Sequence, residues 1–201
     1  MSKSGQNSLP TDEEILSVVN SDDLFIVAVK GHQFIDDILG GIISQFLYDS
    51  HALELKRLSV LLKVDLCIAL GQFPKEIRSR FEKLNGIRNK FAHNRKATLE
   101  SSKAKELFEM LPKRVQEYGL RRSGNSIDSL AMLQVAIAAT IISLHKTLIA
   151  IRERKLRTRV AWQMVEENVP DIWELHNEND WFDEEIKKRI RLLREKDNNV
   201  Q

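Results

Sequence analysis

Helix-breaking residues are scarce in this chain, and this scarcity constrains the fold more than any other feature of the sequence. The 201 residues include 8 glycines and 4 prolines. No stretch sustains the alternation of apolar and polar residues that is typical of a half-buried strand, whereas apolar residues recur at helical spacing in several segments. The sequence therefore predicts an all-α protein, an up-and-down helical bundle with a C-terminal helical extension.

Cap and breaker signals divide the chain into predicted helices. Thr11 is followed three residues later by Glu14, a capping box that predicts a short first helix. Further helices are expected over about 22–48, 54–70, from Pro74 to the end of the motif near residue 93, over 102–110 and over 127–154, and in the charged tail. Glycines 31, 40 and 41 within the second of these helices indicate close packing or a kink.

The segment between the fifth and sixth predicted helices is rich in basic residues and contains a glycine. It includes Arg121, Arg122 and Gly124, and we predict a loop there. Asn125 or Ser126 is the expected N-cap of the helix that follows. That helix is apolar nearly all round, as a central bundle helix or a membrane span would be. Because Gln134, His145 and Lys146 shorten its uncharged run, we expect a bundle helix and no membrane.

Composition restricts the class of protein. Lysine and arginine number 31 and aspartate and glutamate 29, and the net charge of +2 favours neither nucleic acid nor a membrane as a global partner. The single cysteine, Cys67, stands in the apolar run LCIAL and is expected to be buried. A disulfide within the chain is impossible, and the N-terminal residues lack an apolar signal segment, so the cytoplasm is the expected location.

A change of composition suggests the domain limits. We expect a flexible tail over 1–10, a helical bundle over 11–156 and a charged, tryptophan-containing helical extension over 157–201. Glu184 with Lys188 and Glu185 with Arg189 are pairs of the favourable order for a solvated helix in this extension.

The stretch GIRNKFAHNR, residues 86–95, places polar residues on a helix with a clear apolar stripe. The stripe residues recur every three or four positions: Ile77, Phe81, Leu84, Ile87 and Phe91. At about 100° per residue from Ile87, Asn89 lies near 200° and His93 near 240°, so both point away from the core. Gly86 falls on the same side and leaves a notch. Arg88 flanks the core stripe, so it could meet His93 only by a long reach, by local unwinding or from a second subunit.

Two interpretations of this motif remain open. Asn89 and His93 could simply finish an amphipathic helix. Alternatively, Arg88, Asn89 and His93 could form a phosphodiester site, because RNA cleavage through the 2′-hydroxyl needs a proton shuttle and a cation against the developing charge. Histidine and arginine supply both without a metal.

The stretch LNGIRNKFAHN resembles the Arg-x4-His motif of the HEPN superfamily, and residues 58–94 are most similar to the mannitol operon repressor-like family. The resemblance covers roughly residues 22–150. It implies a helical bundle, a homodimer whose two motifs meet across the interface, and metal-independent RNA cleavage in active members, with Arg88, Asn89 and His93 as the catalytic residues. Members of the mannitol repressor-like branch are named as transcriptional regulators, so the resemblance leaves open a non-enzymatic regulator that acts through a protein partner. No basic recognition helix for DNA is apparent.

Other candidates are weaker. The run IRERKLRTR offers a basic set that could track a phosphate backbone or complement a helix C-terminus; the set is Arg152, Arg154, Lys155, Arg157 and Arg159. Tryptophans 162, 173 and 181 could stack on bases or anchor the tail. Histidines 32, 51, 145 and 176 are scattered without metal-ligand spacing, and no cofactor motif is present, so neither metal nor cofactor is expected.

Overall fold

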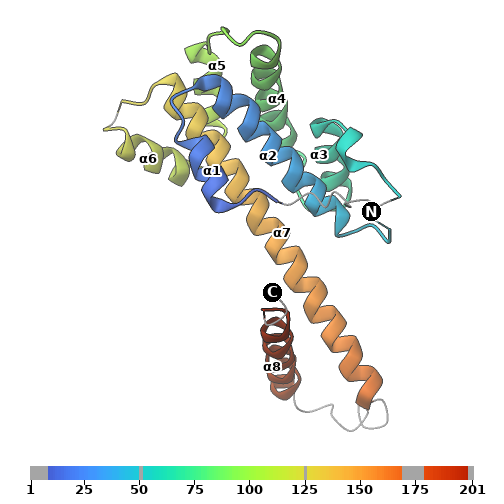
Figure 1. Ribbon diagram of the computed structural model, residues 1–201. Helices are drawn as coiled ribbons and strands as arrows, with labels where there is room; N and C mark the ends of the chain where they lie inside the picture. Colours follow the sequence, from blue (N-terminus) through green and yellow to red (C-terminus); the bar gives the residue numbers. More distant parts are fainter. Residues whose placement is uncertain (1–8, 50–51, 125, 169–178, 199–201) are drawn as a thin grey trace. The chain divides into compact units, whose positions relative to one another are not determined.

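The computed structural model describes residues 9–49, 52–124, 126–168 and 179–198, and its regular elements there are all helices (Figure 1). This part of the chain contains no strand, so the predicted all-α bundle is confirmed. The elements are α1 (Asp12–Val19), α2 (Leu24–Ser44), the 3-10 helix η1 (Leu55–Arg57), α3 (Val60–Ala69), α4 (Ile77–His93), α5 (Ser101–Glu109), α6 (Lys113–Arg122), α7 (Ser129–Asn168) and α8 (Asn179–Asn198).

The chain divides into two compact units, Met1–Leu148 and Ile149–Gln201. The division falls within α7, which continues as one helix through the position 156/157 where the sequence composition changes.

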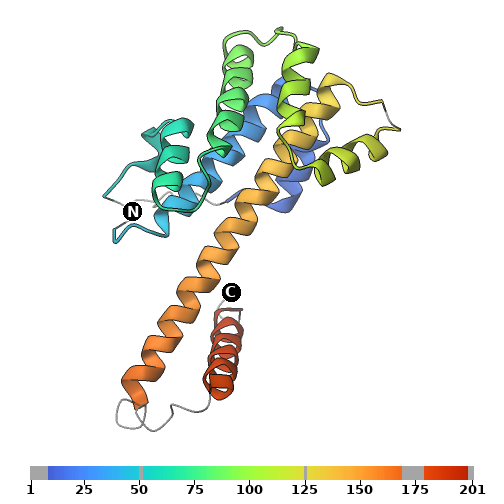
Figure 2. The same cartoon turned by 180° about the vertical axis from the view of Figure 1, so that it is seen from behind.

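In the first unit, α2 is the central element and packs against α1, α3 and α4 (Figures 1 and 2). Its apolar side chains are almost completely buried, as Ile35, Ile38 and Leu39 show. A Cβ added to Gly31 would lie 2.6 Å from Cγ2 of Ile137 on α7, so α2 and the first half of α7 approach closely at this glycine. The predicted close packing is therefore confirmed at Gly31.

The helix starts follow from local hydrogen bonds. The Thr11 hydroxyl accepts from the Glu14 amide at 3.2 Å and the Glu14 carboxylate accepts from the Thr11 amide at 2.8 Å, which confirms the capping box. The third helix begins later than predicted, because a 3-10 turn intervenes and Ser59 caps α3 by accepting from the Leu62 amide at 3.2 Å.

The predicted basic loop was wrong. Arg121 and Arg122 lie in the last turn of α6, and Gly124 follows with a φ of 65°, a left-handed conformation that favours glycine. Packing explains the helix, because a Cβ at Gly119 would lie 3.2 Å from the Phe108 ring. The N-cap prediction for α7 was also wrong, since the Asp128 carboxylate accepts from the Ala131 amide at 2.7 Å.

The second unit has its own small core. Val160 and Met164 of α7 and Ile186 of α8 are buried together, with Leu156, Ala161 and Ile190 around them. The predicted Glu185–Arg189 pair is present at 3.2 Å. Trp173 and His176 lie outside the described residues, as do His51 and Asn125.

By length and composition alone, α7 could cross a membrane over Ser129–Val165, and 39% of that apolar window is buried in the protein. A core helix of a soluble protein passes the same test, and Leu133, Ile137, Ile141 and Leu144 of this helix are buried.

Candidate functional site

Helix α4 carries the Arg-x4-His motif; His93 is exposed as predicted, whereas Asn89, which was predicted to point away from the core, is half-buried. Phe81, Leu84, Ile87 and Phe91 are at most 5% exposed and hold the helix against the core. The helix ends at His93, because Asn94 leaves the helical conformation with φ −146° and ψ 100° while its amide still donates to the Lys90 carbonyl at 3.1 Å. The motif therefore occupies the last two turns of a well-anchored helix.

Arg88 and Asn89 form one pair. The Arg88 Nη1 donates to the Asn89 Oδ1 at 3.0 Å, and both side chains are half-buried. This hydrogen bond fixes the guanidinium beside the amide and leaves its remaining donors for another acceptor. Among the described residues, no hydrogen bond joins Arg88 to His93, in keeping with their separation of five residues on a continuous helix.

His93 stands apart on the exposed side of α4. Its side chain is exposed, and Gly86, two turns earlier, is exposed as well. A Cβ added to Gly86 would meet no atom within 4 Å, so nothing in the described chain fills the notch. Lys83 and Lys90 border this side and pair with Glu106 of α5 at 2.5 Å and Glu100 at 2.9 Å.

One of the scattered histidines lies close to the motif, because the Arg88 charge acts on it. His32 of α2 is 6% exposed, and its Nε2 has no hydrogen-bond partner among the described residues. Its pKa is lowered from 6.5 to about 4, first by burial and then by the Arg88 charge, while Asp36 and the Asn85 side chain act in the opposite direction. Arg88 thus lies near a neutral, buried imidazole.

The polar residues His32, Asp36 and Lys63 lie where α2 packs against α3 and α4, and we call them the polar seam; its ion pair joins a buried lysine to a half-buried aspartate. Lys63 is 2% exposed, and its Nζ donates to the Asp36 Oδ1 at 2.6 Å and to the Asp36 carbonyl at 3.4 Å. A Cβ on Gly40 would lie 4.0 Å from this ammonium group, so the glycine packs next to the end of the lysine side chain. A signal for the seam exists in the sequence, since His32, Asp36 and Lys63 each stand in a largely apolar helix.

Other sequence candidates are dispersed. Cys67 is buried, and burial raises the pKa of its thiol to about 12, which suits a packing role. No cluster of metal-ligating side chains occurs among the described residues. The basic set on α7 lies in the second unit and is exposed throughout.

Comparison with known proteins gives no relative. No family model, no curated protein and no solved structure matches this chain.

Proposed function

We propose that this protein is a HEPN-like regulatory protein that cleaves RNA without a metal, at a composite site formed when two copies bring their α4 helices together. The resemblance of residues 58–94 to the mannitol repressor-like family supports the proposal. The separation of His93 from Arg88 and Asn89 on α4 supports it as well. The observation that carries it is the exposure of His93 apart from the Arg88–Asn89 pair, because each copy then offers one half of a site.

Each residue type has a defined task in this chemistry. The imidazole of His93 takes the proton of the ribose 2′-hydroxyl as its oxygen attacks the adjacent phosphorus. The P–O bond to the 5′-oxygen breaks, and that oxygen takes up a proton from solvent water as it leaves. The partner copy's arginine would offset the charge on the phosphate oxygens, and Asn89 would hold the guanidinium in place. The products carry a 2′,3′-cyclic phosphate and a 5′-hydroxyl.

Gly86 suits the required approach of two helices. Its exposed backbone and the empty space around its Cβ position would let a second α4 come close. A symmetric contact at this point would face each His93 toward the other copy's arginine.

One observation favours a second candidate, a non-enzymatic regulator that acts through a protein partner. Arg88 is half-buried and close enough to His32 to lower the pKa of that imidazole. An arginine with this position has a role in the packing of a single copy, so the motif could serve the fold alone.

Cleavage of a panel of RNAs in the presence of EDTA tests the proposal. His93→Ala should reduce the rate about 10²- to 10⁴-fold, because it removes the proton shuttle. Arg114→Ala, an exposed arginine on α6, is the matched control and should leave the rate unchanged. If the wild-type protein leaves every RNA intact, or if His93→Ala cleaves equally well, the enzyme proposal fails and the regulator remains.

A further inference from the structure

The basic segment of α7 lies in the middle of a helix rather than at its end. Arg159 is followed by nine more helical positions, since α7 continues to Asn168. Favourable interactions with a helix dipole are confined to the last turn, which begins well after Arg159. Complementing the helix C-terminus therefore does not explain these cations, and another reason for their accumulation is needed.

The cations gather around an exposed tryptophan. Trp162 is 63% exposed. With about 100° per residue and Trp162 taken as zero, Lys155 lies near 20°, Arg159 near 60°, Arg152 near 80° and Arg154 near −80°. All four are exposed. We call these five residues the basic stripe.

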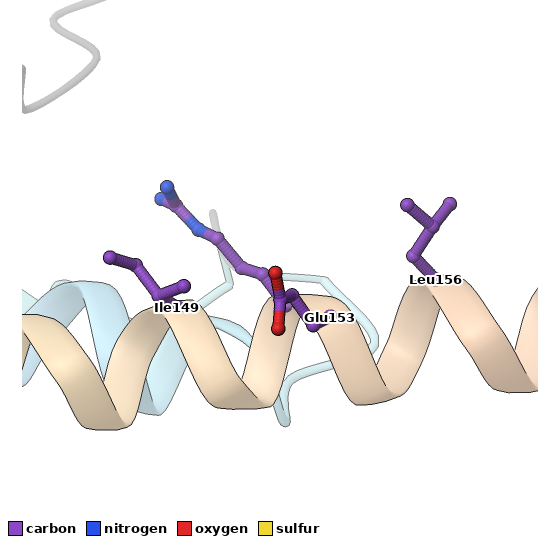
Figure 3. A pocket seen from close by; sticks show the side chains of 4 residues that line it. Ile149, Glu153 and Leu156 are labelled. Atoms are coloured by element: carbon purple, nitrogen blue, oxygen red, sulfur yellow. The ribbon is translucent and has the colours of Figure 1, made fainter. Parts of the chain in front are cut away.

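The other side of α7 is occupied. Val160 and Met164 are buried there against Ile186 of α8. Arg157 lies near −140° from Trp162, toward this packed side, and Glu153 lies near 180°. Figure 3 shows Glu153 along a shallow groove that Ile149, Leu156 and also Arg152 line, so this carboxylate lies beside one end of the basic stripe, and no other carboxylate of α7 lies between Arg152 and Trp162.

Three of the four cations of the stripe, the arginines Arg152, Arg154 and Arg159, have no carboxylate partner among the ion pairs of the described residues. Three uncompensated guanidinium groups on one helix side repel one another and attract a polyanion. The stripe is about 15 Å long from Arg152 to Trp162 at 1.5 Å per residue, which is sufficient for a short run of nucleotides.

We propose that the basic stripe binds single-stranded RNA, with the cations on successive phosphates and the Trp162 indole stacked on a base. Stacking needs an unpaired base, and guanidinium groups and an indole are the groups that bind flexible single strands without reading sequence. An acidic protein would satisfy the cations but would leave the exposed indole unused. The choice of RNA over DNA rests on the proposed function, whereas the stripe itself fits any single strand.

Fluorescence anisotropy of a dye-labelled oligouridine, at low salt and with the full-length chain, tests the inference. Trp162→Ala should weaken binding about 5- to 150-fold, as the loss of one stacked base does. Arg159→Ala should weaken binding and lower the salt slope by about 0.7, the value for one phosphate contact with a single strand. Arg157→Ala removes the same charge from the other side of α7, so its effect should be distinctly smaller. Circular dichroism checks that each variant stays folded.

Several results would overturn the inference. These are an absence of binding by the wild-type chain, equal binding by Trp162→Ala, or equal losses for Arg157→Ala and Arg159→Ala. Equal affinity for oligothymidine DNA would overturn the choice of RNA. If Trp162→Ala alters sedimentation and leaves RNA binding intact, the stripe is a contact between protein chains instead. Arg114→Ala, on α6, should bind as the wild type does. A wild-type protein that binds but never cleaves refutes the proposed function and leaves the stripe standing.

Discussion

Acidification should destabilise the protein through His32. The folded-state pKa of His32 is about 4, against 6.5 for the free side chain. Below pH 6.5 the His32 side chain binds a proton in the unfolded chain, whereas in the folded chain it binds one only near pH 4. The contribution to stability is therefore complete above pH 6.5 and is lost as the pH falls toward 4. With about 1.4 kcal/mol for each pKa unit, the loss is about 2 kcal/mol at pH 5 and about 3 kcal/mol at pH 4.

A non-titrating variant separates this effect from the general loss of stability in acid. His32→Gln keeps a polar side chain near Asn85 and cannot take up the proton. It should cost stability at pH 7, because the site is 6% exposed and shaped for an imidazole. Between pH 7 and pH 5, however, the variant should lose about 2 kcal/mol less than the wild type. Urea denaturation followed by circular dichroism at a series of pH values measures both curves.

The charged neighbours of His32 offer a second check. Arg88 and Lys63 oppose protonation, and Asp36 and Asn85 favour it. Arg88→Gln should therefore raise the pKa of His32 and make the acid loss smaller than in the wild type. Parallel pH curves for His32→Gln and the wild type, or a His32 pKa above 6 by NMR titration, would refute the account of a neutral, buried imidazole.

Three further predictions concern the bundle. Gly31→Ala should destabilise the bundle by about 1–3 kcal/mol, because the new Cβ would overlap Ile137. Gly86→Ala should stabilise a single copy by up to about 1 kcal/mol, because alanine favours a helix more than glycine does and its Cβ meets no atom here. Thermal melts in which both variants shift equally would contradict this contrast. A chain that ends at Lys155 should still melt cooperatively, because the first unit is compact by itself, and an insoluble product would contradict that boundary. Sedimentation should show a homodimer that Gly86→Leu disrupts without unfolding the monomer, while a wild-type monomer at tens of micromolar would remove the basis for a composite site.

The parts of the fold that follow from the sequence are those set by local rules. The capping box at Thr11 and the apolar stripe of α4 depend on residues three or four positions apart, and both are present as predicted. The position of His93 on the exposed side of α4 follows from the same periodicity. These features need no knowledge of what the helix packs against.

The errors occur where contacts between distant segments decide the outcome. The α6 sequence has few apolar residues and contains Gly119, so its periodicity predicts a loop, but contacts of Gly119 with Phe108 and Val135 favour the helix. Likewise, the composition change near residue 157 does not end α7, because Val160 and Met164 pack against Ile186. Helical propensity and charge density at those positions carry no information about these partners.

Arg88 shows why the candidate site could be located from the sequence while its surroundings could not. The helical period places Arg88 at the edge of the core stripe, and it is half-buried there. The period cannot tell which residue of α2 lies opposite, and that residue proves to be an imidazole whose protonation Arg88 opposes. Because one side chain belongs to both the motif and the α2–α4 packing, Arg88→Ala alone cannot separate chemistry from folding. His93 has no such second role, since it is exposed at the helix end, so the decisive test of the enzyme proposal is on His93.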